Sequence, residues 1–229
     1  MALLKDRREA GRLLADKLVG KTSAGTVVLA LPRGGVPVGF EIAQRLRLPL
    51  EPLIVRKLGV PHYPEFAMGA IAAGGHCMID RELVQRLRLS NAAISAVVER
   101  EARELQEREQ HYPASAPLAS LAGRPVLIVD DGMATGSTVL AAISALRALQ
   151  VGRITVAVPV SSREAHEKVL GWSDAVIILQ QPEPFDAVGQ WYADFRQVEL
   201  VEARALLARA QRLRAPAAPA SATEHSHSH

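Results

Sequence analysis

The sequence predicts an α/β fold in which helices cover both faces of a parallel β-sheet. Short apolar segments rich in β-branched residues alternate along the chain with longer segments of helical periodicity. The helical segments are long enough to connect parallel strands, which need crossovers of about a dozen residues or more. Hydrophobic residues make up 48% of the 229 residues, enough for one well-buried core. We therefore expect a single domain over residues 1–214.

The first part of the chain is expected to supply two helices and two strands. Apolar residues follow a helical spacing over residues 6–19, which predicts the first helix. The run TVVLAL, residues 26–31, predicts a buried strand, followed by a turn at Pro32–Gly35 and a helix through Arg45. The segment LEPLIVRK, residues 50–57, predicts the second strand.

The middle of the chain is less regular. Residues Gly59–Gly69 are rich in glycine and proline and predict a mobile loop. The following segment, GAIAAGGHCMID, predicts a hairpin that turns at Gly74–Gly75. A helical stretch begins near Asp80 and is strongest over residues 90–110, where charges of both signs alternate. We interpret this charged run as a solvated helix face.

The last part of the chain returns to strict alternation of strands and helices. Strands are predicted at residues 126–130, 154–160 and 175–179, and helices at about 136–149 and 163–170. An aromatic-containing segment follows the last strand and precedes a C-terminal helix that is expected to end at about Leu213. The small, proline-rich and polar segment 215–229 is expected to be a disordered tail. Ligands of parallel sheets bind at the carboxyl ends of the strands. The informative loops are therefore those after Leu31, Lys57, Val129 and Leu179.

Composition excludes several classes of protein. The formal net charge is only +3, without the basic surplus of a nucleic-acid-binding protein. The single cysteine, Cys77, allows no intrachain disulfide, which is consistent with a reducing cytoplasm. The N-terminus lacks the apolar run of a signal peptide, and no segment approaches the ~20 apolar residues of a membrane span. We expect a cytoplasmic protein that binds neither nucleic acid nor membrane, and a homodimer is compatible with the pattern.

The segment VLIVDDGMATGST, residues 126–138, carries the most specific chemistry. A buried strand is followed by an acid pair, Asp130 and Asp131, and then by a turn of small residues that opens a helix at Ser137. Backbone N–H groups at a helix N-terminus bind phosphate, and adjacent carboxylates accept hydrogen bonds from vicinal hydroxyls of a ribose. The segment therefore predicts a ribose 5-phosphate site. It has neither the lysine of a Walker A loop nor the spacing of a Rossmann fingerprint.

This segment resembles the 5-phosphoribosyl-1-pyrophosphate (PRPP) motif of type I phosphoribosyltransferases. The resemblance implies the parallel-sheet fold of that family with a small additional hood, here expected mainly at residues 180–200. It also implies that Asp130 and Asp131 hold the ribose hydroxyls and a Mg²⁺ ion, with Asp131 taking part in catalysis. The 5′-phosphate would then be held by Ala134, Thr135, Gly136, Ser137 and Thr138, and Gly132 would also belong to the PRPP site.

Two further loops resemble the pyrophosphate-binding parts of the same family. Arg33, Gly34 and Gly35 follow the first strand and resemble its pyrophosphate loop, where the peptide bond before the basic residue is often cis. By that resemblance the Pro32–Arg33 bond is expected to be cis, with the two glycines admitting unusual backbone angles. Arg56 and Lys57 resemble the Arg-Lys pair of adenine and orotate enzymes. Arg33, Arg56 and Lys57 are thus expected to neutralise pyrophosphate, with Gly59–Gly69 closing over the site.

The acceptor side is less well defined by the sequence. PEPFDAVGQWYADF, residues 182–195, resembles the base-binding hood of hypoxanthine-guanine enzymes, which implies that Phe185, Val188 and Asp194 contact the acceptor. Its two internal spacings are each one residue longer than in those enzymes, and the lysine after the preceding strand is missing. Ala134 also replaces the aspartate that those enzymes use on the base. Glu65 is our candidate for that role, and a plain surface carboxylate is the alternative.

The expected function is transfer of the phosphoribosyl group of PRPP to a small aromatic, nucleobase-like acceptor, with Mg²⁺ as cofactor. One alternative is a regulator of the same fold that senses PRPP without catalysis. The chain has neither an appended helix-turn-helix nor a basic stripe, and it keeps the pyrophosphate-side residues. The other alternative, a PRPP-synthesising diphosphokinase, needs a second such domain and an ATP site that the sequence does not contain.

Overall fold

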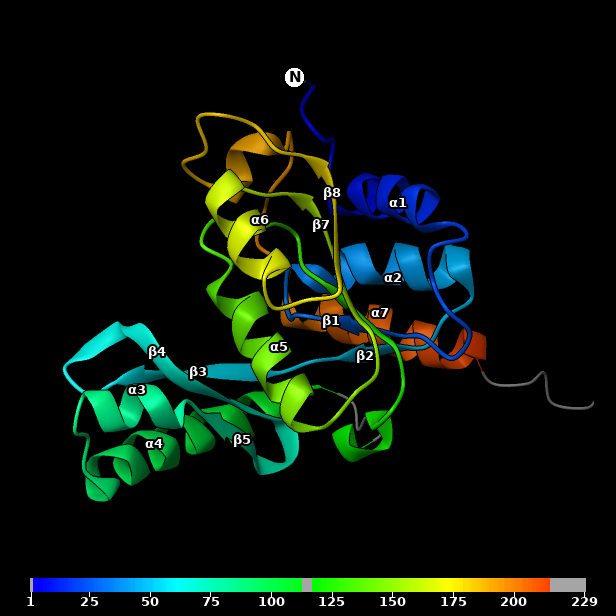
Figure 1. Cartoon of the computed structure of the whole chain (residues 1–229). Helices are drawn as coiled ribbons and strands as arrows, with labels where there is room; N and C mark the ends of the chain where they lie inside the picture. Colours follow the sequence, from blue (N-terminus) through cyan, green and yellow to red (C-terminus); the bar gives the residue numbers. More distant parts are fainter. Residues whose placement is uncertain (1, 113–116, 215–229) are drawn as a thin grey trace, which may run out of the picture.

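A computed structural model describes residues 2–112 and 117–214, without the side chains of Glu65 and Arg214. Its centre is a five-stranded sheet in which every pairing is parallel (Figure 1). The strands are β1 (Val27–Ala30), β2 (Leu50–Pro52), β6 (Val126–Val129), β7 (Ile154–Val160) and β8 (Ala175–Gln180). Their order is β2-β1-β6-β7-β8, so β1 and β6 lie side by side at the centre. The predicted α/β fold with a parallel sheet is confirmed.

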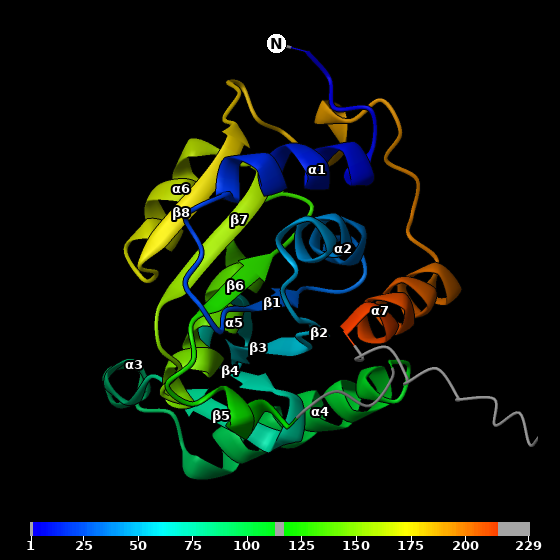
Figure 2. The same ribbon diagram turned by 90° about the vertical axis from the view of Figure 1, so that its right-hand side faces the viewer.

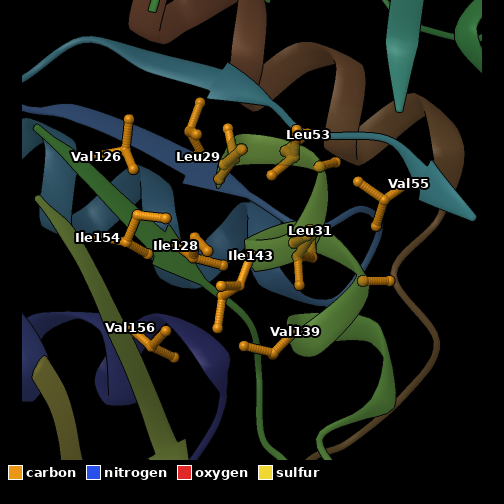
Figure 3. Packing of buried hydrophobic residues seen from close by; sticks show 14 of the residues in the cluster. Leu29, Leu31, Leu53, Val55, Val126, Ile128, Val139, Ile143, Ile154 and Val156 are labelled. Carbon is orange, nitrogen blue, oxygen red and sulfur yellow. The ribbon is translucent and has the colours of Figure 1, made fainter. Parts of the chain in front are cut away.

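Helices cover both faces of this sheet (Figures 1 and 2). One face packs against α1 (Arg7–Leu18), α2 (Gly35–Leu46) and α7 (Leu200–Arg214), and the other against α5 (Ser137–Ala148) and α6 (Arg163–Leu170). Successive strand residues point to opposite faces. Leu29 and Ile128 therefore pack against α5 (Figure 3), whereas the neighbouring Val28 and Leu127 pack on the α1 and α2 side.

A second, antiparallel sheet extends from the central sheet (Figure 1). It consists of β3 (Val55–Val60), β4 (Tyr63–Ala72) and β5 (His76–Ile79), with a short 3₁₀ turn, η1 (Ala73–Gly75), before β5. Two helices follow it, α3 (Arg81–Arg86) and α4 (Asn91–Glu109). Leu58 and Met68 on one face of this sheet pack against α4, while Val55 and Ala70 on the other face join the core beneath α5.

Three local predictions are wrong. The expected strand over residues 50–57 is divided, because the chain leaves the central sheet after Pro52 and pairs with β4 from Val55 onward. The expected loop over Gly59–Gly69 is instead part of the β3–β4 hairpin. The single long helix is interrupted between Leu87 and Ser90, where Arg88 takes a positive φ of 51° and Ser90 caps α4 through the amide of Ala93.

The remaining predicted elements agree with the structure. β7 and α6 have the predicted bounds, and the hairpin turn at Gly74–Gly75 is present. Two short 3₁₀ turns, η2 (Leu118–Leu121) and η3 (Val188–Trp191), complete the chain. The expected disordered tail lies outside the described residues. Over the described part of the chain, no helix combines the length and apolar character needed to cross a membrane.

Candidate functional site

The acid pair lies at the carboxyl end of β6, in the middle of the central sheet. The Asp131 amide donates a hydrogen bond to Asp130 Oδ1 at 2.9 Å, which holds the Asp130 carboxylate against the backbone of Asp131. Burial raises the pKa of both, and the charge of Asp131 raises the pKa of Asp130 further. Such a pair is costly without a ligand, because burial disfavours the charged forms. Its position and its chemistry are those of a binding site for a cation or for sugar hydroxyls.

The turn that follows, Gly132–Gly136, is fixed to the end of β7. The Met133 amide donates to the Val160 carbonyl at 2.9 Å, and Ser162 Oγ donates to the Ala134 carbonyl at 2.7 Å. Gly136 has a φ of 72° and begins α5 at Ser137. The predicted phosphate residues are thus gathered at a helix N-terminus, where free N–H groups and the helix dipole favour an anion.

The turn after β1, Pro32–Gly35, lies against the acid pair. The expected cis peptide bond between Pro32 and Arg33 is confirmed. Gly34 has ordinary helical angles of φ −60° and ψ −38°, so the expectation that it supplies unusual angles is wrong. Its role is spatial, because a Cβ on Gly34 would overlap the Asp131 carboxylate. A Cβ on Gly35 would lie 2.5 Å from the Val129 carbonyl oxygen.

Arg56 and Lys57 point to opposite faces of the antiparallel sheet, as successive strand residues must. Lys57 lines a groove that also contains Ser137, the first residue of α5. Arg56 pairs instead with α4, where its Nε lies 2.8 Å from Glu101 Oε2 and its guanidinium also contacts Glu104. The structure therefore places Lys57 in the same groove as the N-terminus of α5, whereas Arg56 pairs with α4.

A cavity of about 490 Å³ adjoins Arg33 and includes residues that the sequence analysis missed. The end of α4 and the residues after it contribute Arg108, His111 and Tyr112, and Thr138 lies on the same wall. Burial raises the pKa of Tyr112, and the charges of Arg33 and Arg108 oppose that rise. Among the described residues that line it, several are basic and none is acidic. The run interpreted as a solvated helix face thus ends at a basic cavity.

Arg7 on α1 was also missed. Its Nε lies 2.7 Å from Asp131 Oδ2, and both side chains are largely buried. The Arg7 guanidinium lowers the pKa of Asp131, which partly offsets the effect of burial. Tyr192 holds the same residue from another side, because its hydroxyl donates to the Asp131 carbonyl at 2.6 Å. No local motif indicates either contact, since Arg7 and Asp131 are 124 positions apart.

The hood, residues 180–200, brings its aromatic side chains next to the acid pair. Phe185 stacks on Trp191 with ring centroids 6.3 Å apart. Val188 lies over the phosphate turn, since a Cβ on Gly132 would be 2.5 Å from Val188 Cγ1. Asp194 faces Arg196, whose hydrogen bonds lower the pKa of Asp194 to about 2. The side chain of Glu65 lies outside the described part of the chain, so its candidate role stays a prediction.

The acid pair thus lies between a glycine turn and a helix N-terminus, at the centre of the parallel sheet of an α/β protein. Comparison with known proteins agrees. The phosphoribosyl transferase domain family matches residues 4–189, and the chain belongs to this family. The type I fold predicted from the sequence is thereby confirmed.

Two groups of relatives extend this assignment. A provisionally named phosphoribosyl transferase of Mycobacterium tuberculosis, in strains CDC 1551 / Oshkosh and ATCC 25618 / H37Rv, is 42% identical over 212 residues. The match covers 93% of this chain and 48% of that protein, so this chain spans about half the length of the curated relatives it matches. The crystal structure of TT1426 from Thermus thermophilus is similar with a TM-score of 0.82 and 38% identity, covering 91% of this chain and 99% of that one.

Proposed function

We propose that this chain transfers the 5-phosphoribosyl group of PRPP to an aromatic, nucleobase-like acceptor and releases pyrophosphate. The observation that carries the proposal is the meeting of three parts at one point. The acid pair lies in contact with Gly34 on one side and continues into the phosphate turn on the other. A ribose bound to the acid pair would have its 5′-phosphate at the turn and its C1 substituent toward Arg33.

Basic residues support binding of the pyrophosphate group. Arg33 lines a cavity together with Arg108 and His111, and Lys57 lines a groove together with Ser137, the first residue of α5. In the amide orientation that satisfies both partners, the Gln197 oxygen accepts hydrogen bonds from the Arg33 guanidinium, which orients it. Positive charge at these positions stabilises negative charge that develops on the leaving group.

The acid pair fits magnesium. Among the described residues there is no cluster of three candidate metal ligands, and Mg²⁺ needs none, because it commonly takes one or two carboxylates together with phosphate oxygens and water. Asp130 and Asp131 are two adjacent oxygen donors of this kind. When bound, the ion would neutralise charge on pyrophosphate.

The reaction is a displacement at C1 of the ribose. The bond from C1 to the pyrophosphate oxygen breaks and its electron pair leaves with pyrophosphate, while a nitrogen lone pair of the acceptor forms the new bond. Positioning and charge stabilisation supply most of the catalysis. Val188 lies over Gly132, next to the acid pair, and Phe185 belongs to the same apolar cluster of the hood, which suits a flat acceptor. Glu65 is the proposed base for an acceptor proton.

Pyrophosphate release tests the proposal. The protein is incubated with PRPP, Mg²⁺ and a panel of heteroaromatic bases, and we expect pyrophosphate release above the background measured without acceptor.

Asp131→Asn removes a charged hydrogen-bond acceptor and should weaken PRPP binding about ten- to a hundredfold. Asp16→Asn, at an exposed ion pair on α1, is the control and should leave binding unchanged. If the protein binds PRPP but releases no pyrophosphate with any base, it is a sensor of PRPP and not an enzyme.

A further inference from the structure

Arg7 makes contacts on all sides, which is unusual for the first residue of a surface helix. Its Nε donates to Asp131 Oδ2 at 2.7 Å, and one terminal nitrogen donates to the Arg196 carbonyl at 2.8 Å. The guanidinium carbon lies 3.8 Å from the centre of the Phe195 ring. Only 11% of the Arg7 side chain is exposed. The guanidinium therefore joins the acid pair to the hood through three different types of contact.

The next residue shows that this arrangement is specific to position 7. Arg8 also forms an ion pair, with Glu41 on α2, but half of its side chain is exposed. Its partner belongs to the packing of α1 on α2, away from the acid pair. Two adjacent arginines on one helix therefore serve different parts of the molecule.

Asp131 has little freedom to move once Arg7 is in place. Gly34 lies directly against one side of its carboxylate, and Arg7 holds Oδ2 on another. Its backbone carbonyl accepts the Tyr192 hydroxyl at 2.6 Å. Arg7 and Tyr192 thus fix the side chain and the backbone of the same residue, and both link it to the hood. If the Asp131 carboxylate moves, the Arg7 guanidinium moves with it and changes its contacts with Phe195 and Arg196.

We propose that Arg7 is a positioning residue that orients the Asp131 carboxylate for the ribose and couples it to the aromatic side chains of the hood. The inference rests on the proposed function and extends it. Arg7 does not contact the reacting atoms; it acts through Asp131 on the sugar side and through Phe195 on the acceptor side. Lysine cannot replace it fully, because an ammonium group lacks the planar fork that makes several directed contacts at once.

The test combines PRPP affinity with a reporter in the hood. The chain has two tryptophans, Trp172 on the surface and Trp191 against Phe185. In a Trp172→Phe background, fluorescence reports on Trp191 alone. We expect PRPP with Mg²⁺ to change Trp191 emission.

Arg7→Gln should weaken PRPP binding, measured by calorimetry, about tenfold or more. It should also remove most of the change in Trp191 emission at saturating PRPP. Arg8→Gln is the matched control and should retain both.

The outcomes separate this inference from the proposed function. Equal PRPP affinity and an equal Trp191 response in Arg7→Gln would overturn the role of Arg7 while leaving the proposed function in place. Absence of PRPP binding by the unmodified protein would remove both. If Arg7→Gln does not fold, as judged by circular dichroism, Arg7→Lys decides, because it keeps the charge but loses the fork. Its PRPP affinity and its Trp191 response should both be lower than those of the unmodified protein, and full retention of both would contradict the proposal.

Discussion

At the scale of single residues, the site depends on glycines at positions that have no room for a side chain. Gly34 and Gly35 have no positive φ, so any residue could adopt their backbone conformation. They are needed because the Asp131 carboxylate at Gly34 and the Val129 carbonyl at Gly35 approach closer than a Cβ permits. Glycine is therefore required in the two predicted loops for two different physical reasons. Gly136 supplies a left-handed conformation with φ 72°, whereas Gly34 supplies room.

Gly34→Ala tests that distinction. The added methyl group would overlap the Asp131 carboxylate, which Arg7 holds in place. We expect PRPP affinity to fall at least about tenfold, with a loss of about 1–3 kcal/mol in the free energy of unfolding, as for other overpacking substitutions. Calorimetry and urea unfolding measure the two effects.

Gly171→Ala is the control for that substitution. Its Cβ would come no closer than 3.5 Å to the atoms around it, and surface changes of this kind usually stay within about 0.5 kcal/mol. Unchanged PRPP affinity in Gly34→Ala would show that the carboxylate is free to move aside, which contradicts the packing described for Asp131.

The residues of the site that the sequence could predict are those adjacent along the chain. Asp130 to Thr138 form one motif, in which strand, turn and helix are all encoded locally. Arg7, Arg108 and Tyr192 reach the same site from distant segments, and no local spacing indicates their contacts. Arg56 shows the converse case, since it pairs with α4 in the structure and its role toward pyrophosphate stays a prediction. A dipeptide can resemble a functional pair, but strand alternation sends its two side chains to opposite faces.

At the scale of elements, two of the three predictions that failed involve non-local strand pairing. β7 and α6 were predicted correctly because their periodicity and caps lie within their own sequences. The β3–β4 hairpin contains Gly59 and Pro64, which favour a loop when read locally. The structure accommodates them at a bulge, where β3 and β4 shift register next to Gly59. A Cβ on Gly59 would lie 2.8 Å from Pro64, so this glycine permits the two strands to approach.

The ion pairs between α4 and β3 make the stability of the folded protein depend on pH. Glu101 is buried at 7% exposure and accepts hydrogen bonds from Arg56 and Arg100. Burial alone would raise the pKa of Glu101, but these hydrogen bonds outweigh it and hold the pKa below its usual value. The unfolded chain therefore binds a proton more readily than the folded chain. The contribution of Glu101 is fully present above the unfolded-state pKa of about 4.3 and is lost as the pH falls through the lower folded-state pKa.

Glu101→Gln should consequently be less stable than the unmodified protein at pH 7, by about 1–3 kcal/mol for loss of hydrogen bonds to a charged group. The difference should shrink as the pH falls below about 4.3. Urea unfolding across this range measures it. Glu107→Gln, at an exposed position of the same helix, is the control. A difference that grows toward acid pH would reverse the sign and contradict the assigned hydrogen bonds.

At the scale of the whole molecule, the site draws on both ends of the described chain. α1 supplies Arg7, the turn after β1 supplies Gly34, β6 leads to the acid pair, and the hood supplies Tyr192. The two sheets also share one core, since Val55 and Ala70 of the antiparallel sheet belong to the same buried cluster as Leu29 and Val139 (Figure 3). We propose on these grounds that residues 1–214 unfold as one cooperative domain.

Ligand-linked unfolding tests that proposal. A ligand that binds only the folded state stabilises it by about 2.7 kcal/mol at a hundred times its Kd. Because the contacts around the acid pair come from α1, both central strands and the hood, PRPP with Mg²⁺ should stabilise every part of the domain equally.

Unfolding is followed by Trp191 fluorescence in the Trp172→Phe background and by far-ultraviolet circular dichroism. The two signals should give coincident transitions, and the ligand should shift both. Asp131→Asn should lose most of the shift at the same PRPP concentration. Separate transitions, with only the fluorescence signal responding to PRPP, would show that the antiparallel sheet and α4 form an independent unit, despite the core that they share with α5.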